Sequence, residues 1–412
     1  MEAELLDHIV VVGAGMAGLS VAESLRDGGF EGRITLVGEE PHLPYSRPPL
    51  SKEFLTGKGG QAAQEQGVWL RETAQLDALE LDLRLGRRAQ RLLPGQRRVE
   101  LSDGAALTCD GIVIASGARA RAPATELAGV HVLRTLDDAK ELREAMAGVD
   151  RIAVIGAGFI GAEVAASART LGLEVALIEA ASTPMTRAID PRVGTVLTEL
   201  HRDNGVDLRL GAGVVGFDSG PGHNRVERLR LSDGSTVTAP LVVAGLGVEL
   251  NTDWLADSGV RLDPDLGGVQ CNAHCETSLP GVFAAGDIAS WPHPRYGGRL
   301  RLEHWTNASE QAEVAAHNLL AGAGSKREYT PVPYFWSDQY GGKVQLLGQA
   351  APADEVEFVH GSPESRKFVA FLGRAGRLVG VLGLRSTPKV MRYRPLLAAE
   401  TTWDEALAAA AG

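Results

Sequence analysis

Short apolar runs separated by glycine-rich turns mark the regular elements at the start of the chain. The run Ile9–Val12 is long enough for a strand that is buried on both faces of a parallel sheet. The pattern that follows places Leu19, Ala22 and Leu25 on one face of a helix. Because Arg33–Val37 comes next and again reads as a strand, the pattern predicts a strand–helix–strand unit of an α/β fold.

The turn between the first strand and the helix carries the pattern Gly-x-Gly-x-x-Gly, formed by Gly13, Gly15 and Gly18. In this motif the first glycine permits a tight turn, the second lets a pyrophosphate approach the backbone, and the third lets the helix pack on the strand. The helix N-terminus then presents unpaired N–H groups to the phosphates. An acid after the second strand, Glu39 or Glu40, can accept a hydrogen bond from a ribose, so the segment predicts a dinucleotide site.

The same unit recurs in the middle of the chain. The strand Ile152–Ile155 precedes a second glycine loop and a helix, and the strand Glu174–Ile178 then ends at Glu179. The glycines of this loop are Gly156, Gly158 and Gly161. A Leu-Ser-Asp-Gly turn also occurs twice, at 101–104 and 231–234, and predicts in each unit a hairpin followed by a returning parallel strand. One such loop is a weak signal, whereas two complete copies predict two related dinucleotide-binding domains.

Composition excludes several classes of protein. The chain has 412 residues, with 50 Gly, three Cys and a formal charge of −11. An acidic chain is a poor default partner for nucleic acid, and no apolar run approaches the ~18 residues that span a bilayer. The cysteines form no Cys-x-x-Cys pair, which favours a reducing compartment. We therefore expect a cytoplasmic protein that binds neither nucleic acid nor membrane and has no metal site of its own.

A third motif indicates that one of the two dinucleotides is a flavin. The short apolar strand that starts at Gly281 ends in the pair Gly286-Asp287. Glycine lets the backbone approach a ligand closely, and a carboxylate at a strand end can accept hydrogen bonds from the ribityl hydroxyls of a flavin. Since this motif follows both glycine loops, we expect FAD as one of the two cofactors.

Together these motifs resemble the two-dinucleotide flavoprotein disulfide-reductase superfamily, which has a glutathione-reductase-like fold with FAD in the first domain and a nicotinamide nucleotide in the second. Within it, the segment Pro44–Lys52 resembles oxygenase-coupled NADH:ferredoxin reductases of the putidaredoxin reductase, rhodocoxin reductase and biphenyl dioxygenase reductase type. Further matching segments are Leu133–Ala139, Glu303–Ala308 and Phe335–Gln339. The resemblance covers nearly the whole chain.

The resemblance implies a set of residues for each cofactor. For FAD they are the loop residues Gly13, Gly15, Met16, Ala17 and Gly18, together with Glu39, Arg47, Lys52, Arg134, Asp287 and Trp305. An arginine can pair with a pyrophosphate or a flavin carbonyl, and Lys52 can stabilise charge on the reduced ring. Trp305 and Trp336 would shield the isoalloxazine and offer a contact for electron exit. With Lys52 and Glu163, which by resemblance approaches the nicotinamide, they form the expected catalytic set.

The second loop is expected to bind NAD, as NADH rather than NADPH. Glu179 can accept from the ribose 2′-hydroxyl, whereas a 2′-phosphate would meet a like charge there. The residues Ala180-Ala181-Ser182 that follow include no arginine for such a phosphate. The expected contacts are Gly156, Gly158, Phe159, Ile160, Gly161 and Glu179, with Arg187 and Gly247 added by resemblance.

The cysteine positions decide how electrons leave. Relatives that reduce disulfides or peroxide need a reactive cysteine near the flavin, but residues 19–108 contain none. Cys109 precedes a buried strand and reads as an inert core thiol, and Cys271 and Cys275 are too far apart to bond on an extended stretch. Electrons must then leave the flavin directly, and a flavin can release them singly to a one-electron acceptor. We therefore expect a separate [2Fe–2S] ferredoxin as the partner.

Such ferredoxins are usually acidic, so docking on this acidic chain requires a local basic face. The stretch Arg366–Arg394 contains eight basic residues and no acidic ones, and Arg295, Arg299 and Arg301 form a second cluster. Both are candidate docking surfaces.

The expected architecture has two Rossmann-like domains and a C-terminal α+β domain. The FAD domain comprises 1–117 and 246–324, the NAD domain 118–245, and the third domain 325–412. In the third domain we expect strands at Val344–Leu347, Val356–Val359, Phe368–Leu372 and Leu378–Leu384, followed by a helical tail from Met391 to Ala411. The predicted activity is FAD-dependent transfer of electrons from NADH to a ferredoxin that serves a monooxygenase or Rieske-type dioxygenase. The alternatives are an NADH oxidase or quinone reductase, and an apoptosis-inducing-factor-like protein whose partner binding is switched by reduction.

Overall fold

The computed structural model describes residues 6–57, 67–183, 191–220, 222–322 and 324–411, which form two compact units. The first unit comprises residues 1–46, 68–119 and 249–331, and the second comprises 47–67, 120–248 and 332–412. Each unit contains a five-stranded sheet in which every strand pair is parallel. These two sheets confirm the predicted α/β class.

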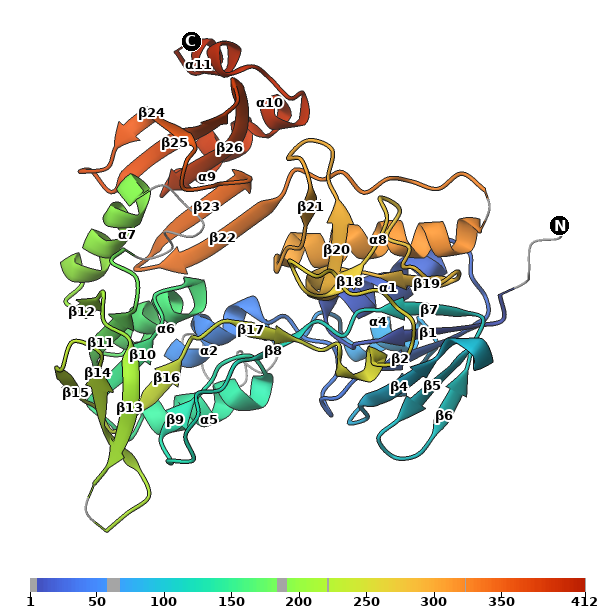
Figure 1. The fold of residues 1–412 in the computed structure, drawn as a ribbon, viewed down its shortest axis with the longest axis horizontal. Coiled ribbons are helices and arrows are strands. Elements are labelled where there is room, and N and C mark those ends of the chain that lie inside the picture. The colour runs from blue at the N-terminus through green and yellow to red at the C-terminus, as the bar shows by residue number, and fades with distance from the viewer. Residues whose placement is uncertain (1–5, 58–66, 184–190, 221, 323, 412) are drawn as a thin grey trace. The chain divides into compact units, whose positions relative to one another are not determined.

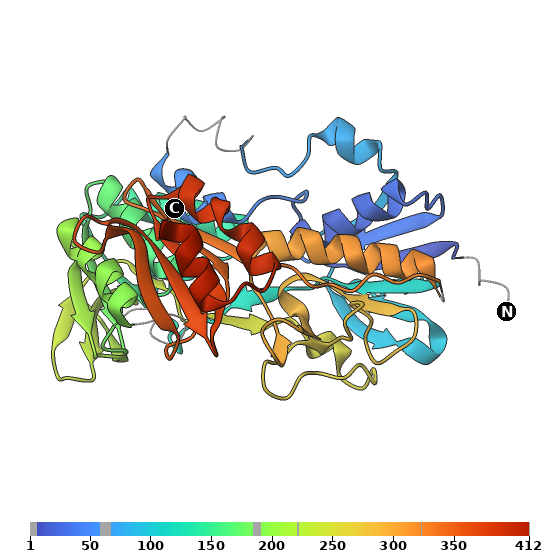
Figure 2. The ribbon, with the colours of Figure 1, turned by 90° about the horizontal axis from the view of Figure 1, so that it is seen from above.

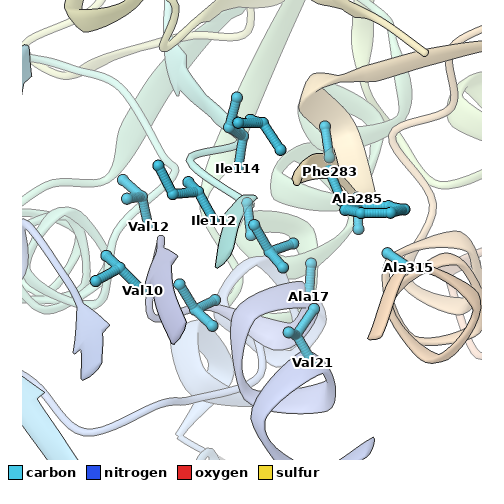
Figure 3. Packing of buried hydrophobic residues seen from close by; sticks show 14 of the residues in the cluster. Val10, Val12, Ala17, Val21, Ile112, Ile114, Phe283, Ala285 and Ala315 are labelled. Carbon is cyan, nitrogen blue, oxygen red and sulfur yellow. The ribbon is translucent and has the colours of Figure 1, made fainter. Parts of the chain in front are cut away.

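The parallel sheet of the first unit has the strand order β19-β7-β1-β2-β3 (Figure 1). Its strands are Val282–Ala284, Gly111–Ile114, His8–Val12, Arg33–Val37 and Leu81–Arg84, in that order. Helices α1 (Met16–Asp27) and α8 (Trp305–Ala321) pack on each other and on this sheet. Figure 3 shows part of the resulting core, which includes Val10 and Ile112 from the sheet, Val21 from α1 and Ala315 from α8. The predicted helix face is confirmed, because Leu19, Ala22 and Leu25 are all buried.

The parallel sheet of the second unit has the order β12-β11-β10-β16-β9. Its strands are Asp207–Leu210, Glu174–Glu179, Arg151–Ile155, Val242–Ala244 and Val130–His131, in that order. The helices of this part are α5 (Leu136–Met146), α6 (Phe159–Thr170) and α7 (Pro191–Asp203). The strand–loop–helix–strand pattern of the first unit is therefore repeated here.

The two predicted hairpin excursions are confirmed as antiparallel sheets. In the first unit, β4 (Ala89–Leu93), β5 (Arg98–Leu101) and β6 (Ala106–Thr108) precede β7. In the second unit, β13 (Val214–Ser219), β14 (Val226–Leu231) and β15 (Thr236–Thr238) precede β16. Each excursion returns through a strand that pairs in parallel with the strand before the glycine loop of its unit, which is β1 in the first and β10 in the second.

The C-terminal part of the second unit is an antiparallel sheet of order β22-β23-β26-β25-β24. Its strands are Tyr334–Gln339, Gly342–Gly348, Arg377–Leu384, Lys367–Arg374 and Glu355–Ser362, in that order. The last four contain the strands predicted from sequence, whereas β22 is a strand that the pattern did not predict. Three short helices cover one face of this sheet (Figure 2).

The predicted tail from Met391 to Ala411 is helical, but it is divided into three helices and begins earlier in the chain. These helices are α9 (Thr387–Arg392), α10 (Arg394–Ala398) and α11 (Trp403–Ala411). Pro395 opens α10, where its missing N–H costs nothing, but it could not continue a helix from α9. Glu400 has a φ of 55° and ends α10 before Trp403 begins the next helix.

The remaining elements are short connections. They are α2 (Glu53–Thr56), α4 (Thr73–Asp77), β8 (Ala118–Ala120), β17 (Val248–Leu250), β18 (Val269–Gln270), β20 (Ala289–Pro292), β21 (Arg299–Leu300) and the 3₁₀ turns Pro48–Ser51, Pro94–Gln96, Asp253–Leu255 and Gly286–Ile288.

Candidate functional site

The first glycine loop has the space that a pyrophosphate requires. A Cβ on Gly13 would lie 2.0 Å from the carbonyl oxygen of Ala115, and one on Gly18 would lie 1.7 Å from that of Gly13. Both glycines are therefore required by contacts within the protein. A Cβ on Gly15 would meet no atom within 4 Å, so this part of the loop faces open space. Together with the start of α1, it forms a cradle that fits the phosphates of a dinucleotide.

The second loop repeats this division of roles. A Cβ on Gly156 would lie 2.3 Å from the carbonyl oxygen of Gly245, and one on Gly161 would lie 1.9 Å from that of Gly156. A Cβ on Gly158, like one on Gly15, would meet no atom within 4 Å. The helix that follows, α6, begins at Phe159, and Ile160 beside it is 45% exposed. The second loop therefore also fits a dinucleotide.

The acid of the second loop is held in place by backbone donors. Oε2 of Glu179 accepts from the N–H of Ala157 (2.8 Å), and Oε1 accepts from the N–H of Ala181 (2.9 Å). These two bonds place a carboxylate beside the loop, where a nucleotide ribose would bind. Gly247 lies in the exposed segment after β16 with a φ of 83°. Arg187 lies outside the described residues.

At the first loop, the two candidate acids differ in their surroundings. Glu40 accepts a hydrogen bond from the hydroxyl of Tyr45 (2.5 Å), whereas the side chain of Glu39 is exposed just past β2. Asp287 is half-buried after β19, and a Cβ on the preceding Gly286 would lie 2.9 Å from Cβ of Ala17. This close approach places the Gly-Asp pair against the start of α1, so the structure brings Asp287 and the first loop together.

A buried charged cluster in the second unit joins two of the predicted catalytic residues. Nζ of Lys52 lies 2.7 Å from Oε2 of Glu163, and that carboxylate is only 3% exposed. The Ser51 hydroxyl donates to the same Oε2 (2.5 Å), and the Ser337 hydroxyl donates to Oε1 (2.7 Å). A buried carboxylate is tolerated when it is paired and hydrogen-bonded, and these three donors meet that requirement.

The Lys52 ammonium makes two hydrogen bonds in the structure. It donates to the carbonyl of Pro48 (3.0 Å) as well as to Glu163. An ammonium has three N–H donors, and the described residues supply acceptors for two of them. A cation with a remaining donor suits the polar edge of a flavin ring.

Sequence reasoning identified Lys52 and Glu163 but missed the hydroxyls that hold them. Ser51 belongs to the segment Pro44–Lys52, and Ser337 and Gln339 belong to Phe335–Gln339. Both segments carry the family resemblance, yet nothing in the sequence places them next to each other.

The other expected residues lie in the following positions. Arg47 donates to the backbone carbonyl of Arg134 (2.6 Å), so the structure brings these two arginines together. Trp305 begins α8 and is 37% exposed. Trp336 is half-buried on β22, stacks with Tyr334 at 5.7 Å between ring centroids, and has the Lys343 ammonium 5.5 Å from its ring.

The basic stretch Arg366–Arg394 does not form one face, which corrects the expectation of a single basic surface. The register of the β25–β26 hairpin pairs Arg374 with Arg377 at one end, while Lys367 and Arg385 lie at the other. Strands of eight residues separate these ends by about 25 Å. The cations of this hairpin therefore lie in two groups.

Many cations of the two predicted basic clusters already bind acceptors within the protein. Ion pairs join Arg366 to Asp203, Arg374 to Asp354, Arg377 to Glu400, Arg299 to Asp263 and Arg301 to Glu303. Arg295 donates to the carbonyl of Pro331 (3.0 Å). The Asp354 carboxylate is only 1% exposed, so Arg374 serves the stability of the C-terminal sheet.

The thiols are buried and unreactive. Burial raises the pKa of Cys109 and Cys271 to about 12 and the pKa of Cys275 well above its usual value. All three are free thiols. Because the thiolate is the reactive form, none of them suits redox work.

Two further kinds of site are absent from the part of the chain that the structure describes. No cluster of three or more His, Cys, Asp or Glu side chains there could hold a metal ion. Within the same residues, no helix combines the length and the apolar character needed to cross a bilayer.

Comparisons with known proteins agree with this geometry. Residues 7–312 match the pyridine nucleotide-disulphide oxidoreductase family, and residues 334–412 match the reductase C-terminal family. Rhodocoxin reductase of Rhodococcus erythropolis is 38% identical over 395 residues, which cover 95% of this chain and 90% of that protein. Putidaredoxin reductase CamA of Pseudomonas putida is 35% identical over 382 residues, covering 91% and 88%.

Solved structures are similar over the same extent. The ferredoxin reductase for the CYP199A2 system from Rhodopseudomonas palustris is 34% identical, with a TM-score of 0.89 over 96% of this chain and 95% of that one. The covalent putidaredoxin reductase–putidaredoxin complex gives 32% identity and a TM-score of 0.89, covering 96% and 93%.

These findings define the chain as an oxidoreductase of the two-dinucleotide flavoprotein class, which uses FAD and NADH. The chain belongs to the pyridine nucleotide-disulphide oxidoreductase family and carries the reductase C-terminal domain.

Proposed function

We propose that this enzyme takes a hydride from NADH and passes the two electrons, one at a time, to a [2Fe–2S] ferredoxin that serves a monooxygenase or a Rieske-type dioxygenase. The observation that carries the proposal is the pair of complete dinucleotide loops in a chain whose three thiols are all buried. Electrons can then reach the outside only from the flavin itself. The similarity to ferredoxin reductases along nearly the whole chain supports the same exit.

The FAD site is proposed to comprise the first loop and the residues that the resemblance adds. Gly13, Gly15, Met16, Ala17 and Gly18 would carry the pyrophosphate on the N-terminus of α1. Asp287 would accept from the ribityl hydroxyls. Glu39 is the better candidate for the ribose, because the carboxylate of Glu40 is engaged by Tyr45. Bound FAD accepts two electrons as hydride and releases them singly.

The NADH site is proposed to comprise the second loop with Phe159, Ile160, Arg187 and Gly247. The two backbone N–H donors on Glu179 hold its negative charge in place, so a 2′-phosphate would be repelled and a 2′-hydroxyl accepted. This anchoring supports a preference for NADH over NADPH.

Lys52 is proposed to stabilise the negative charge that develops on the flavin ring as hydride arrives. Its ammonium is held by Glu163 and the carbonyl of Pro48, so its position is set before the reaction begins. No proton transfer by a side chain is needed for hydride transfer, and the main requirement on the protein is to align nicotinamide and flavin.

For ferredoxin docking we propose the end of the β25–β26 hairpin that carries Arg385. The backbone N–H of Arg385 donates to the carbonyl of Lys343 (2.9 Å). The Lys343 ammonium lies over the ring of Trp336 and also pairs with Asp338 (2.7 Å). Lys389 adds a further positive charge from α9, which packs on β23. Cations beside a partly exposed tryptophan suit an acidic electron acceptor.

We also propose the domain division expected from sequence, with FAD bound by 1–117 and 246–324, NAD by 118–245, and a C-terminal α+β domain at 325–412. The three thiols in free form support a cytoplasmic location, since that compartment keeps cysteines reduced.

The test is steady-state turnover of the purified holoenzyme with NADH and a panel of acceptors. We expect fast reduction of at least one [2Fe–2S] ferredoxin and slow turnover with quinone or oxygen. Strong turnover with quinone or oxygen and none with any ferredoxin would indicate an oxidase or quinone reductase. Slow turnover with a long-lived NAD–flavin charge-transfer complex and redox-dependent sedimentation would indicate a redox-switched binding protein.

A further inference from the structure

The carboxylate of Glu163 is held from the C-terminal sheet as well as from its own part of the chain. Ser51 and Lys52 bind one of its oxygens, Oε2, from the segment just before α2. The other oxygen, Oε1, accepts from Ser337, which lies on β22 and is separated from Glu163 by 174 residues in sequence. The position of Glu163 therefore depends on residues 334–412, the part that matches the reductase C-terminal family.

The direction of the hydrogen bonds at Ser337 follows from its chemistry. An ionised carboxylate can only accept, so the single hydroxyl proton of Ser337 goes to Glu163. The Ser337 oxygen then accepts from the amide Nε2 of Gln339 (3.2 Å), which fixes the orientation of that amide. The result is a polarised chain of donors, from Gln339 through Ser337 to Glu163, in which all three side chains are buried.

The alternation of side chains along β22 explains why these residues meet α6. Phe335, Ser337 and Gln339 share one face of the strand, and the rings of Phe335 and Phe159 of α6 are 3.9 Å apart. Trp336 projects from the opposite face. A single strand therefore supports Glu163 on one side and presents Trp336 on the other.

We propose that Ser337, assisted by Gln339, is a positioning residue for hydride transfer. It holds the Glu163 carboxylate so that Glu163 in turn holds the Lys52 ammonium where it acts on the flavin. Among the groups that bind the Glu163 carboxylate, Lys52 is charged, whereas Ser51 and Ser337 donate from neutral hydroxyls. The C-terminal sheet thereby contributes to flavin reduction in addition to partner docking. This inference rests on the proposed role of Lys52 at the flavin.

Loss of the Ser337 hydroxyl has a defined expected effect. In S337A, Oε1 of Glu163 loses a donor in a buried place, so the hold on Lys52 loosens. We expect FAD reduction at saturating NADH to slow about tenfold, which corresponds to one hydrogen bond to a charged group. The NADH concentration for half-saturation should change little, because Ser337 is not a nucleotide contact. S337T retains the hydroxyl and should recover most of the rate.

A second readout does not use the reaction. We expect Ser337 and Glu163 to be coupled in urea unfolding, so that the S337A/E163Q pair departs from additivity by about fivefold in the unfolding equilibrium constant. S290A is a matched control, since Ser290 is also buried and donates to a buried carboxylate, that of Asp263 (2.5 Å). It should lower stability to a similar degree and leave flavin reduction unchanged.

The decisive comparison is single-turnover FAD reduction by NADH in four holoenzymes: wild type, S337A, E163Q and the double variant. A positioning role predicts that S337A slows the wild type but adds nothing in the E163Q background. Equal slowing in both backgrounds, or no slowing in either, would overturn the inference. Because no ferredoxin is present, this result is separate from the proposed function, which fails only if ferredoxin is not reduced.

Discussion

The ammonium of Lys52 lies 2.7 Å from the carboxylate of Glu163, although 111 residues separate them in sequence. The pair is almost fully buried, and the carboxylate receives two further hydroxyl donors. A buried ion pair is weak support for stability, because desolvation offsets much of the attraction. Its value here lies in holding a cation in a defined position, which is what stabilisation of a transition state requires.

Replacing Lys52 should slow flavin reduction far more than it affects cofactor binding. In K52M we expect the rate of FAD reduction at saturating NADH to fall roughly 10²-fold, as for other removed electrostatic donors. Stopped-flow absorbance of the holoenzyme measures this rate. K52M leaves Glu163 without its counter-ion, so K52M/E163Q is the control for folding. The double variant should be more stable than K52M, while its flavin reduction should remain slow. A wild-type rate in either variant would contradict the role given to Lys52.

Glu179 should set the preference for NADH. Its carboxylate is anchored by the N–H groups of Ala157 and Ala181, so replacing it by alanine removes a fixed negative charge beside the ribose. We expect the ratio of kcat/KM for NADH to kcat/KM for NADPH to fall about 30-fold in E179A. The variant loses the hydrogen bond to the 2′-hydroxyl of NADH, and it also loses the repulsion toward the 2′-phosphate of NADPH. If wild-type enzyme already prefers NADPH, the assignment of this acid is wrong.

Ferredoxin docking can be tested with the two ends of one hairpin. Reversing Arg385 and Lys389 to glutamate should raise the KM for ferredoxin at least fivefold and leave NADH–ferricyanide turnover unchanged. R377E is the matched control, since it lies at the far end of the same hairpin in a partly exposed ion pair with Glu400. Arg374 is unsuitable, because its loss would leave the buried Asp354 unpaired. A larger effect from R377E would move the docking surface to the other end.

His201 should make stability depend on pH. Burial lowers its pKa to about 4, and its Nδ1 lies 2.6 Å from the hydroxyl of Tyr340. The pKa of histidine in an unfolded chain is about 6.5. Between about pH 6.5 and pH 4 the unfolded chain therefore binds a proton at His201 that the folded chain does not. Stability should therefore fall as pH drops through this window, by up to about 3 kcal/mol from this one group.

The measurement is the thermal midpoint of unfolding from pH 7 to pH 4 for wild type and H201Q. The variant should show a shallower decline. His304, whose pKa burial also lowers to about 4, retains part of the slope in both proteins. Parallel curves for the two proteins would show that His201 is protonated equally in the folded and unfolded chains.

The apolar runs and the spacing of glycines predicted the two parallel sheets well, because buried strands and glycine loops are recognisable from short stretches of sequence. β1 and β2 occupy the predicted runs, and Gly13 and Gly156 stand where the turns require them. The cluster at Glu163 was only half foreseen, since Ser337 reaches it through tertiary packing of β22 on α6, which no periodicity encodes. Charge along the sequence was also a poor guide, since the β25–β26 hairpin sends Arg374 and Arg385 to opposite ends.

Single-turnover reoxidation by ferredoxin tests the proposed exit of electrons from the flavin most directly. Enzyme reduced with one equivalent of NADH is mixed anaerobically with excess oxidised [2Fe–2S] ferredoxin, and the flavin and cluster absorbances are followed together. We expect two ferredoxins to be reduced per flavin, in two one-electron steps. A flavin that stays reduced with ferredoxin but is reoxidised by quinone or oxygen would contradict this expectation.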